Sequence, residues 1–292
     1  MTDLWIQPSG AALGADVHGV DLSRPVRDAQ FARIAEAWRD HLVLRFSGQR
    51  IDDRQLMSFS ARFGELDRVP IAAAHTERGG AGLAPDVAPW VTVISSIVRD
   101  GRPIGGLGSS ELVWHTDMSY NPLPPRASLL YALEVPPTGG DTGFLDMYAA
   151  YETLPEDLRR TVEGRTCIHD SSHNSAGELR KGFQETVDVT RTPGAVHPLV
   201  RLHPVSGRKA LFLGRRPNAY INGLPVEESE AVLDALWAHA TQDPFAWYQK
   251  WRVGDLVMWD NRCVMHRRDG FEPGLRRLMH RTQIVGEPVV AG

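Results

Sequence analysis

Cysteine is scarce in this chain of 292 residues, which contains only Cys167 and Cys263. Two cysteines are too few for a disulfide framework or a cysteine-rich metal site, and we expect both to be small buried side chains. The sequence also lacks any apolar run of the roughly 18 residues that a membrane span requires. Its opening, MTDLWIQPSG, has no basic segment followed by an apolar stretch. We therefore expect no signal peptide, no membrane association and a cytoplasmic location.

An excess of charge of one sign is missing too. The formal net charge is −4, with 42% hydrophobic and 23% charged residues, an ordinary balance for a globular protein. That charge gives no reason to expect a nucleic-acid partner. No linker divides the sequence, so we predict a single domain over residues 1–292, as a monomer or a homo-oligomer.

Short strand-like runs dominate from residue 112 onward, among them ELVWHTDM, ASLLYALEV, DLVMWD and RLMHRTQIV. Turn residues separate these runs. Helical spacing of apolar residues occurs at 28–41, 52–64, about 146–163 and 226–240,. The pattern predicts a mainly β fold with flanking helices around a double-stranded β-helix, the jelly-roll core of cupin-like proteins.

Two segments have the composition of loops. Residues 73–111 are rich in glycine and proline around the strand-like VTVISSIV, and residues 171–194 are polar. Such segments are either surface loops or lids over a binding site. We expect both to be active-site loops if the site lies beside them.

The stretch LVWHTDMSY, residues 112–120, places a histidine and an aspartate two positions apart. In a strand, His115 and Asp117 would face the same side. Together they would supply two of the three ligands of a 2-His-1-carboxylate iron site. Taken alone the motif is weak, because about one His-x-acid is expected by chance in such a chain. A second one, His75-x-Glu77, lies in a probable loop, and we assign it to solvated surface.

The third ligand is left open by spacing alone. His266 closes the strand-like run GDLVMWDNRCVMH and is slightly ahead of the other histidines. His197, His203 and His280 are alternatives, and each is equally typical of a hydrogen-bonded structural histidine.

Two arginines, Arg277 and Arg281, are four positions apart in LRRLMHRTQI. In a strand they would share a face and could hold carboxylates by bidentate hydrogen bonds. The alternative is a solvated edge strand that carries scattered positive charge.

Considered together, these segments resemble the taurine / 2,4-dichlorophenoxyacetate dioxygenase family of iron(II)- and 2-oxoglutarate-dependent oxygenases. The resemblance covers nearly the whole chain and rests on segments in one order: SARFGEL, WHTDMSYNPLPP, PPTGGDTGFLDMYAAYETL, HPLVRLHPVSGRKALF, WDNRCVMH and RRLMHRTQI. It implies three iron ligands, His115, Asp117 and His266. It further implies that Thr142 and Arg277 bind 2-oxoglutarate, and that Arg281 lies on the substrate side or assists the cosubstrate.

The activity that the resemblance implies is hydroxylation of a small organic anion by dioxygen, coupled to decarboxylation of 2-oxoglutarate to succinate and carbon dioxide. Val69, Ala72 and Glu111 stand where the taurine-specific branch has polar pocket residues, which disfavours taurine. GRRPNAYINGLPVEESE looks more like the aryloxyalkanoate-cleaving branches, so we expect a carboxylate with an apolar or aromatic body. A taurine, alkylsulfonate or sulfate ester dioxygenase is the alternative within the family.

Alternatives of another class are a jelly-roll hydrolase using a different metal and a non-catalytic sensor of 2-oxoglutarate. Intact Thr142 and Arg277 favour the oxygenase. Four aromatic residues are pocket candidates or plain core: Tyr120, Phe144, Phe212 and Tyr220,.

Overall fold

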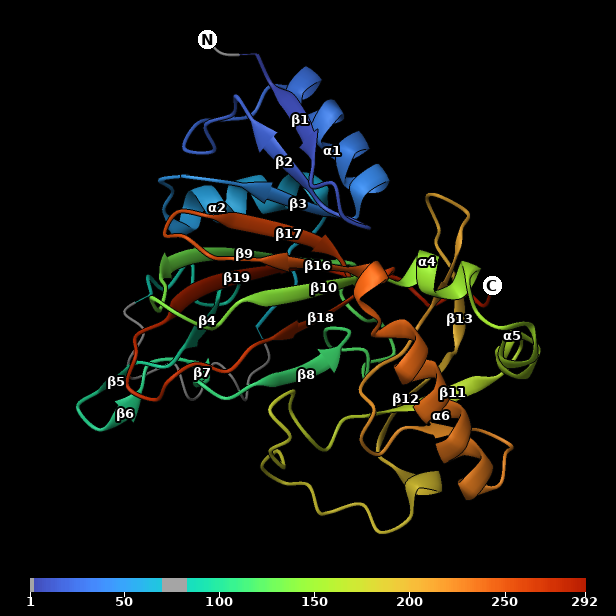
Figure 1. The fold of residues 1–292 in the computed structure, drawn as a ribbon. Helices are drawn as coiled ribbons and strands as arrows, with labels where there is room; N and C mark the ends of the chain where they lie inside the picture. Colours follow the sequence, from blue (N-terminus) through green and yellow to red (C-terminus); the bar gives the residue numbers. More distant parts are fainter. Residues whose placement is uncertain (1–2, 70–82) are drawn as a thin grey trace.

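The largest element of the fold is a sheet of eight strands, seen in a computed structural model that describes residues 3–69 and 83–292 (Figure 1). Neighbouring strands are antiparallel except for the β2–β3 and β4–β7 pairs. In spatial order the strands are β1 (Trp5–Pro8), β2 (Ala15–His18), β3 (Val43–Phe46), β17 (Leu256–Asp260), β9 (Ala127–Glu134), β19 (Leu278–Ile284), β4 (Thr92–Ser95) and β7 (Gly106–Leu107).

A second, four-stranded antiparallel sheet faces part of the first. Its strands, in order, are β16 (Ala246–Gln249), β10 (Thr142–Asp146), β18 (Val264–Arg268) and β8 (Leu112–His115). Phe144 of β10 lies 5.5 Å from Trp259 of β17 between ring centroids. The space between the sheets is filled by one apolar cluster, which includes Leu130 and Ala132 of β9 and Met279 of β19.

Two helices cover the opposite face of the large sheet, α1 (Asp28–His41) and α2 (Asp53–Ser60). Side chains alternate between the two faces of the large sheet along β9. Leu129 and Tyr131 pack under the helices, whereas Leu130 and Ala132 face the other sheet,. The central strands of the large sheet are therefore buried on both faces.

The end of α2 follows the sequence prediction. A short 3-10 helix, η1 (Ala61–Phe63), extends it to Gly64, whose φ is 146°. A Cβ at this glycine would lie 2.8 Å from Ile284 Cγ2 of β19. Glycine is therefore required there both by conformation and by the close approach of the last strand.

The remaining elements form a smaller lobe beside the two sheets, at the right of Figure 1. They are α4 (Met147–Glu152), α5 (Glu156–Val162), β11 (Thr166–Asp170), η2 (Val189–Arg191), β12 (Gly194–Pro198), β13 (Val200–Leu202), β14 (Lys209–Leu211), β15 (Tyr220–Ile221), α6 (Val226–Ala240) and η3 (Asp243–Phe245). A hairpin of β5 (Val98–Arg99) and β6 (Arg102–Pro103) projects from the far end of the large sheet.

Several predicted elements have different bounds in the structure. The helix expected at 146–163 is two helices, because Pro155 lies between them and begins the second one. The helix expected at 226–240 is present with those bounds. The described part of 73–111 is not merely loop, since β4 and β7 join the large sheet there. His75, Glu77 and Ala72 lie outside the described residues.

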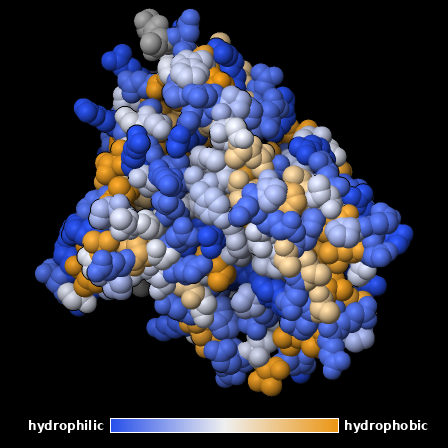
Figure 2. Space-filling view, in the orientation of Figure 1, coloured by the Kyte–Doolittle hydropathy of each residue, from blue (hydrophilic) through white to orange (hydrophobic). Residues whose placement is uncertain are grey.

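The segment between β11 and β12 contains no helix or strand other than η2. Figure 1 shows it passing beneath β8, to which it is tied by a hydrogen bond from Val113 N–H to Ser175 O of 3.0 Å. The face shown in Figure 2 is largely hydrophilic, with hydrophobic residues scattered over it. No described helix has both the length and the apolar character needed to cross a membrane.

Candidate active site

Two histidines meet across neighbouring strands of the small sheet. His115 is the last residue of β8, and His266 is the central residue of β18. The two are directly paired in the register of these strands. Their side chains leave the sheet on the same face, and their ring centroids are 4.2 Å apart.

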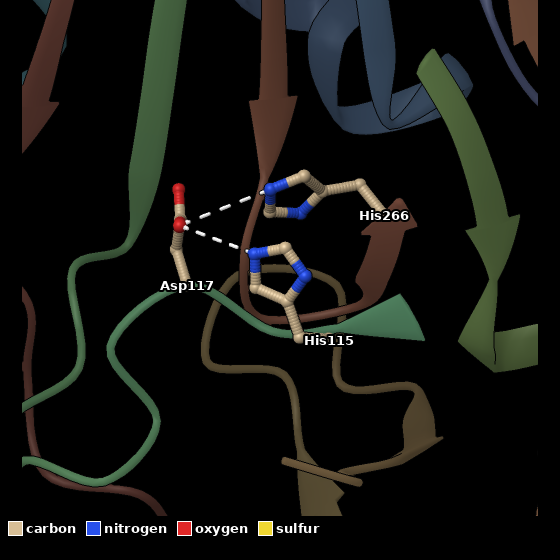
Figure 3. A group of neighbouring side chains, drawn as sticks. All are labelled: His115, Asp117 and His266. Atoms are coloured by element: carbon tan, nitrogen blue, oxygen red, sulfur yellow. Dashed lines mark ion pairs between the residues drawn. The ribbon is translucent and has the colours of Figure 1, made fainter. Parts of the chain in front are cut away.

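Asp117 also lies beside the two histidines, but the local structure that places it there is not the predicted strand. The strand expected over 112–118 ends at His115, so strand alternation does not bring the carboxylate to the histidines. Asp117 lies in a turn instead, in which Thr116 N–H donates to Gly214 O and Met118 has a φ of 46°. The turn carries Asp117 Oδ1 to 3.8 Å from Nε2 of each histidine (Figure 3).

The protonation of these groups suits a divalent metal ion. Nδ1 of His115 is 2.7 Å from Val113 O. Because a carbonyl oxygen only accepts, Nδ1 carries the proton in this contact, and the lone pair of Nε2 faces Asp117 and His266,. Burial, with His115 close by, lowers the pKa of His266 to about 3. Burial alone would raise the pKa of Asp117, but the Arg281 guanidinium and His266 hold it well below its usual range. Two imidazole nitrogens and one carboxylate oxygen are the donor set of a 2-His-1-carboxylate site.

The carboxylate of Asp117 is held from the large sheet. Ser128 Oγ donates to Oδ2 over 2.8 Å, and Gln283 Nε2 donates to the same oxygen over 3.3 Å. Arg281 Nη1 lies 3.0 Å from Oδ1 and 3.2 Å from Oδ2. Asn261 Nδ2 in turn donates to Ser128 Oγ over 3.0 Å. These contacts turn Oδ1 toward the histidines and occupy Oδ2.

A pair of buried arginines lies in the same cavity. Arg277 is 2% exposed, and its Nε has no partner among the described residues. Arg268 follows His266 by two positions on β18 and is paired across strands with Thr142 of β10. Its Nε and Nη1 are also unpartnered among the described residues.

The electrostatics of this pair favour an anion. Burial lowers the pKa of Arg268 to about 10. Burial and the neighbouring charge of Arg268 lower that of Arg277 to about 9. Thr142 Oγ1 accepts from Trp251 Nε1 over 2.9 Å, so its own hydroxyl proton remains free to donate. Two cations and a hydroxyl donor, with no salt bridge to either arginine among the described residues, have the chemistry needed to receive a carboxylate.

The competing histidines have structural roles. His197 Nε2 lies 3.0 Å from Asn121 O, and His280 Nδ1 lies 2.5 Å from Asp53 Oδ1 on the outer face of β19. His203 contacts Asp260. None of these three lines the cavity that contains His115.

A second cluster, formed by His203, Asp260 and Cys263, also has ligand-like spacing. Arg262 donates to both oxygens of the Asp260 carboxylate, over 2.8 and 2.7 Å. His203 contacts the second oxygen at 3.1 Å. That carboxylate is already satisfied, so the cluster is an internal ion-pair network.

The four aromatic candidates divide by position. Tyr120 lines the cavity. Phe144 is fully buried behind His266, 6.2 Å from it between ring centroids. Phe212 and Tyr220 are core residues that do not line the cavity.

Sequence reasoning missed residues that the structure adds to the site. Arg268 could have been found, because it follows His266 by two positions in a predicted strand and so shares its face. Ser128 was visible as one small polar residue in the apolar run ASLLYALEV. Arg180 and Arg215 also line the cavity, but they lie outside helices and strands, where no periodicity marks them.

Comparison with known proteins gives consistent matches over the whole chain. The family model described as "Taurine catabolism dioxygenase TauD, TfdA family" matches residues 5–283. The (S)-phenoxypropionate/alpha-ketoglutarate-dioxygenase of Delftia acidovorans is 34% identical over 100% of this chain and 98% of its own length. The alpha-ketoglutarate-dependent 2,4-dichlorophenoxyacetate dioxygenase of Cupriavidus pinatubonensis is 36% identical over 97% and 98%.

A solved structure is similar as well. The crystal structure of a putative alpha-ketoglutarate-dependent taurine dioxygenase from Burkholderia xenovorans superposes with a TM-score of 0.78 at 32% identity. The superposition covers 99% of this chain and 92% of that one.

Proposed function

This chain belongs to the TauD, TfdA family of 2-oxoglutarate-dependent dioxygenases, and on that premise we propose that it hydroxylates a small organic anion. The favoured substrate is an aryloxyalkanoate-like carboxylate. Its full-length relatives named for phenoxypropionate and 2,4-dichlorophenoxyacetate support this choice. The sequence departures from the taurine branch support it too.

One observation carries the proposal: a 2-His-1-carboxylate donor set and an uncompensated pair of arginines line one cavity. His115, Asp117 and His266 would hold iron(II) through Nε2, Oδ1 and Nε2. The bound iron, with 2-oxoglutarate and dioxygen, supplies the oxidation of the substrate coupled to release of succinate and carbon dioxide.

The remaining residues of the cavity would bind and orient. Arg277 and Thr142 would receive the distal carboxylate of 2-oxoglutarate, and Arg268 lies beside them on β18. Arg281 would act on the substrate side while it also holds Asp117 through Nη1. Apolar walls formed by Ile94, Leu107, Leu112, Leu130 and Trp259 would exclude water from the reacting groups,.

We further propose that the core of the fold is a jelly roll. Two facing, largely antiparallel sheets, joined by an apolar core and carrying the site between them, support a jelly-roll or double-stranded β-helix core,. The two cysteines, Cys167 and Cys263, are both buried and free, which is consistent with a reducing compartment, so we also propose that the protein acts in the cytoplasm.

Anaerobic titration with iron(II) and 2-oxoglutarate tests the reaction class. The expected result is a weak visible charge-transfer band that is abolished in His115→Ala. The absence of a band with the intact protein would refute the oxygenase and favour a hydrolase that uses a different metal.

A substrate screen that follows succinate formation tests the substrate class. It should include aryloxyacetates, aryloxypropionates, taurine, alkylsulfonates and alkyl sulfates. Turnover is expected to be fastest with the aryloxyalkanoates. Faster turnover of a sulfonate or a sulfate ester would assign the chain to the alternative substrate class within the family.

A further inference from the structure

Two arginines with no role in the proposed function lie against the ring of Tyr120. Tyr120 lies in the turn that follows Asp117. The guanidinium carbon of Arg180 lies 4.1 Å from the centroid of the Tyr120 ring, and that of Arg215 lies 5.6 Å from it. Arg180 comes from the segment between β11 and β12, and Arg215 from the segment between β14 and β15. All three residues line the cavity of the candidate active site.

Neither arginine has a carboxylate partner among the described residues. Arg215 is 7% exposed, and its Nη2 donates to a backbone oxygen, that of Asp170, over 2.6 Å. Arg180 makes no salt bridge within the described part of the chain, and its ring contact is with Tyr120. A buried guanidinium without a counter-charge is costly, and it indicates a ligand that supplies one.

The nearby acids are engaged elsewhere. Asp170 Oδ1 accepts from Ser172 N–H over 2.7 Å, and its Oδ2 is 3.0 Å from His173 Nδ1. Glu185 Oε2 faces His173 Nε2 at 3.3 Å.

Glu178, the other acid of this segment, accepts from Asn174 Nδ2 over 2.8 Å. None of these three carboxylates forms a salt bridge with Arg180 or Arg215 among the described residues. The two guanidiniums therefore lie close to each other's charge, and the nearby charges of Asp170 and Asp117 act on Arg215 without a direct ion pair. Burial first, and the charge of Arg180 second, lower the pKa of Arg215 to about 10.

This pair lies in a different part of the cavity from Arg268 and Arg277. Arg268 and Arg277 lie on and beside the strands β18 and β19, where the cosubstrate would bind. Arg180 and Arg215 lie on loops, close to the turn that carries Asp117. The turn and the loops are tied together, because Thr116 N–H donates to Gly214 O. The cavity thus has a second cationic region that the cosubstrate's carboxylate does not need.

We propose that Arg215 and Arg180, whose guanidiniums both lie against the Tyr120 ring, together bind the carboxylate of the prime substrate. The inference rests on the proposed function and extends it, because it places the substrate's anion on this pair rather than on Arg281 alone. Arg281 already has Nη1 committed to Asp117. The apolar body of the substrate then lies between this pair and the metal ligands.

The chain also contains a matched control. Arg216 is adjacent to Arg215, but it points outward and pairs with Glu230 and Asp234 of α6 at 2.6 and 2.7 Å. Arg216→Gln removes the same charge from the same segment without touching the cavity. Arg215→Gln and Arg180→Gln remove it from the proposed carboxylate site.

The experiment measures binding of phenoxyacetate and of its uncharged analogue phenoxyacetamide by calorimetry. The full-length protein is saturated with 2-oxoglutarate and iron(II) under anaerobic conditions. The wild type and Arg216→Gln are expected to bind phenoxyacetate well and phenoxyacetamide poorly. Arg215→Gln should weaken phenoxyacetate binding about 10- to 100-fold, the usual effect of losing a hydrogen bond between charged groups, and Arg180→Gln less, since its side chain is more exposed.

The outcomes separate this inference from the function on which it rests. The charge-transfer band reports iron and 2-oxoglutarate, and it should keep its intensity and 2-oxoglutarate dependence in Arg215→Gln and Arg180→Gln. Absence of the band in the wild type would refute the proposed function. An intact band, with phenoxyacetate bound equally by the wild type and Arg215→Gln or bound by neither, would overturn the assignment of Arg215 and Arg180.

Discussion

The most direct test of how the site is built is Ser128→Ala, which removes one hydroxyl from beneath Asp117. Ser128 is fully buried and donates to Asp117 Oδ2 over 2.8 Å. It accepts from Asn261 over 3.0 Å and from Gln283 over 3.1 Å. A hydrogen bond to a charged group contributes about 1.5–3 kcal/mol. Loss of a group that orients a metal ligand typically weakens metal binding about 10- to 100-fold, which is about 1.4–2.7 kcal/mol.

The two estimates agree, and the structure favours the lower end of the range. Asp117 Oδ2 keeps Gln283 and Arg281 as partners when Ser128 is truncated. We therefore expect the dissociation constant for iron(II), measured anaerobically by competition with a chelator, to rise about 10-fold. The metal-free protein should also lose about 1–3 kcal/mol of unfolding free energy, because the buried Asn261 amide loses its acceptor whereas Gln283 keeps Asp117 Oδ2,.

Ser60→Ala is the matched control. Ser60 is equally buried and bonds Leu56 O and the Thr282 hydroxyl, both at 2.7 Å, on the helix-covered face of β19. It should lower stability in urea unfolding and leave iron affinity unchanged. If Ser128→Ala bound iron(II) as tightly as the wild type, or if Ser60→Ala weakened binding as much, the account of Asp117 would be wrong.

Three further predictions concern charged groups. Arg277→Ala should raise the dissociation constant for 2-oxoglutarate at least about 30-fold, since truncating one member of a buried charged pair costs about 2–5 kcal/mol. Titration of the visible band would measure it, and a collapse of iron affinity instead would show that the arginine is misassigned. Arg281→Ala should weaken both iron and substrate binding, because its Nη1 contacts Asp117; unchanged iron affinity would limit it to the substrate side. Arg262 and His203 hold the pKa of Asp260 well below its usual range despite its burial. This carboxylate therefore stabilises the fold above its unfolded pKa of about 3.9, and that contribution is lost progressively as the pH falls from there toward the lowered folded pKa. Urea unfolding of the metal-free protein between pH 6 and about pH 3 should show this loss, and Asp260→Asn should flatten it; an equally steep acid limb in that variant would assign the loss to other groups.

Much of the local structure was predictable because it depends on short-range pattern. The helix at 226–240 has the predicted bounds. The division at Pro155 was missed, because apolar spacing continues across a proline that cannot continue the helix,. Convergence of His115 and Asp117 was expected from strand alternation, yet a turn produces it. Here the two side chains converge as predicted, but a turn rather than a strand brings them together.

The parts that were missed depend on contacts between distant segments. Ser128 and Gln283 act on Asp117 only because β9 and β19 are neighbours in the large sheet. Arg180 and Arg215 come together at Tyr120 from two loops. No spacing along the chain encodes these approaches, since the fold as a whole sets them.

The pairing of His115 with His266 would also link metal binding to completion of the chain's topology. The two proposed ligands are 151 positions apart in the sequence, and they meet only when β8 and β18 are in register. An unfolded chain retains at most the local pair His115 and Asp117, so a metal ion binds the native state much more strongly than the unfolded one. Occupancy would then raise the free energy of unfolding by mass action, by about 2.7 kcal/mol when the free metal is at 100 times its dissociation constant. Loss of iron would thus lower the protein's resistance to unfolding as well as its activity.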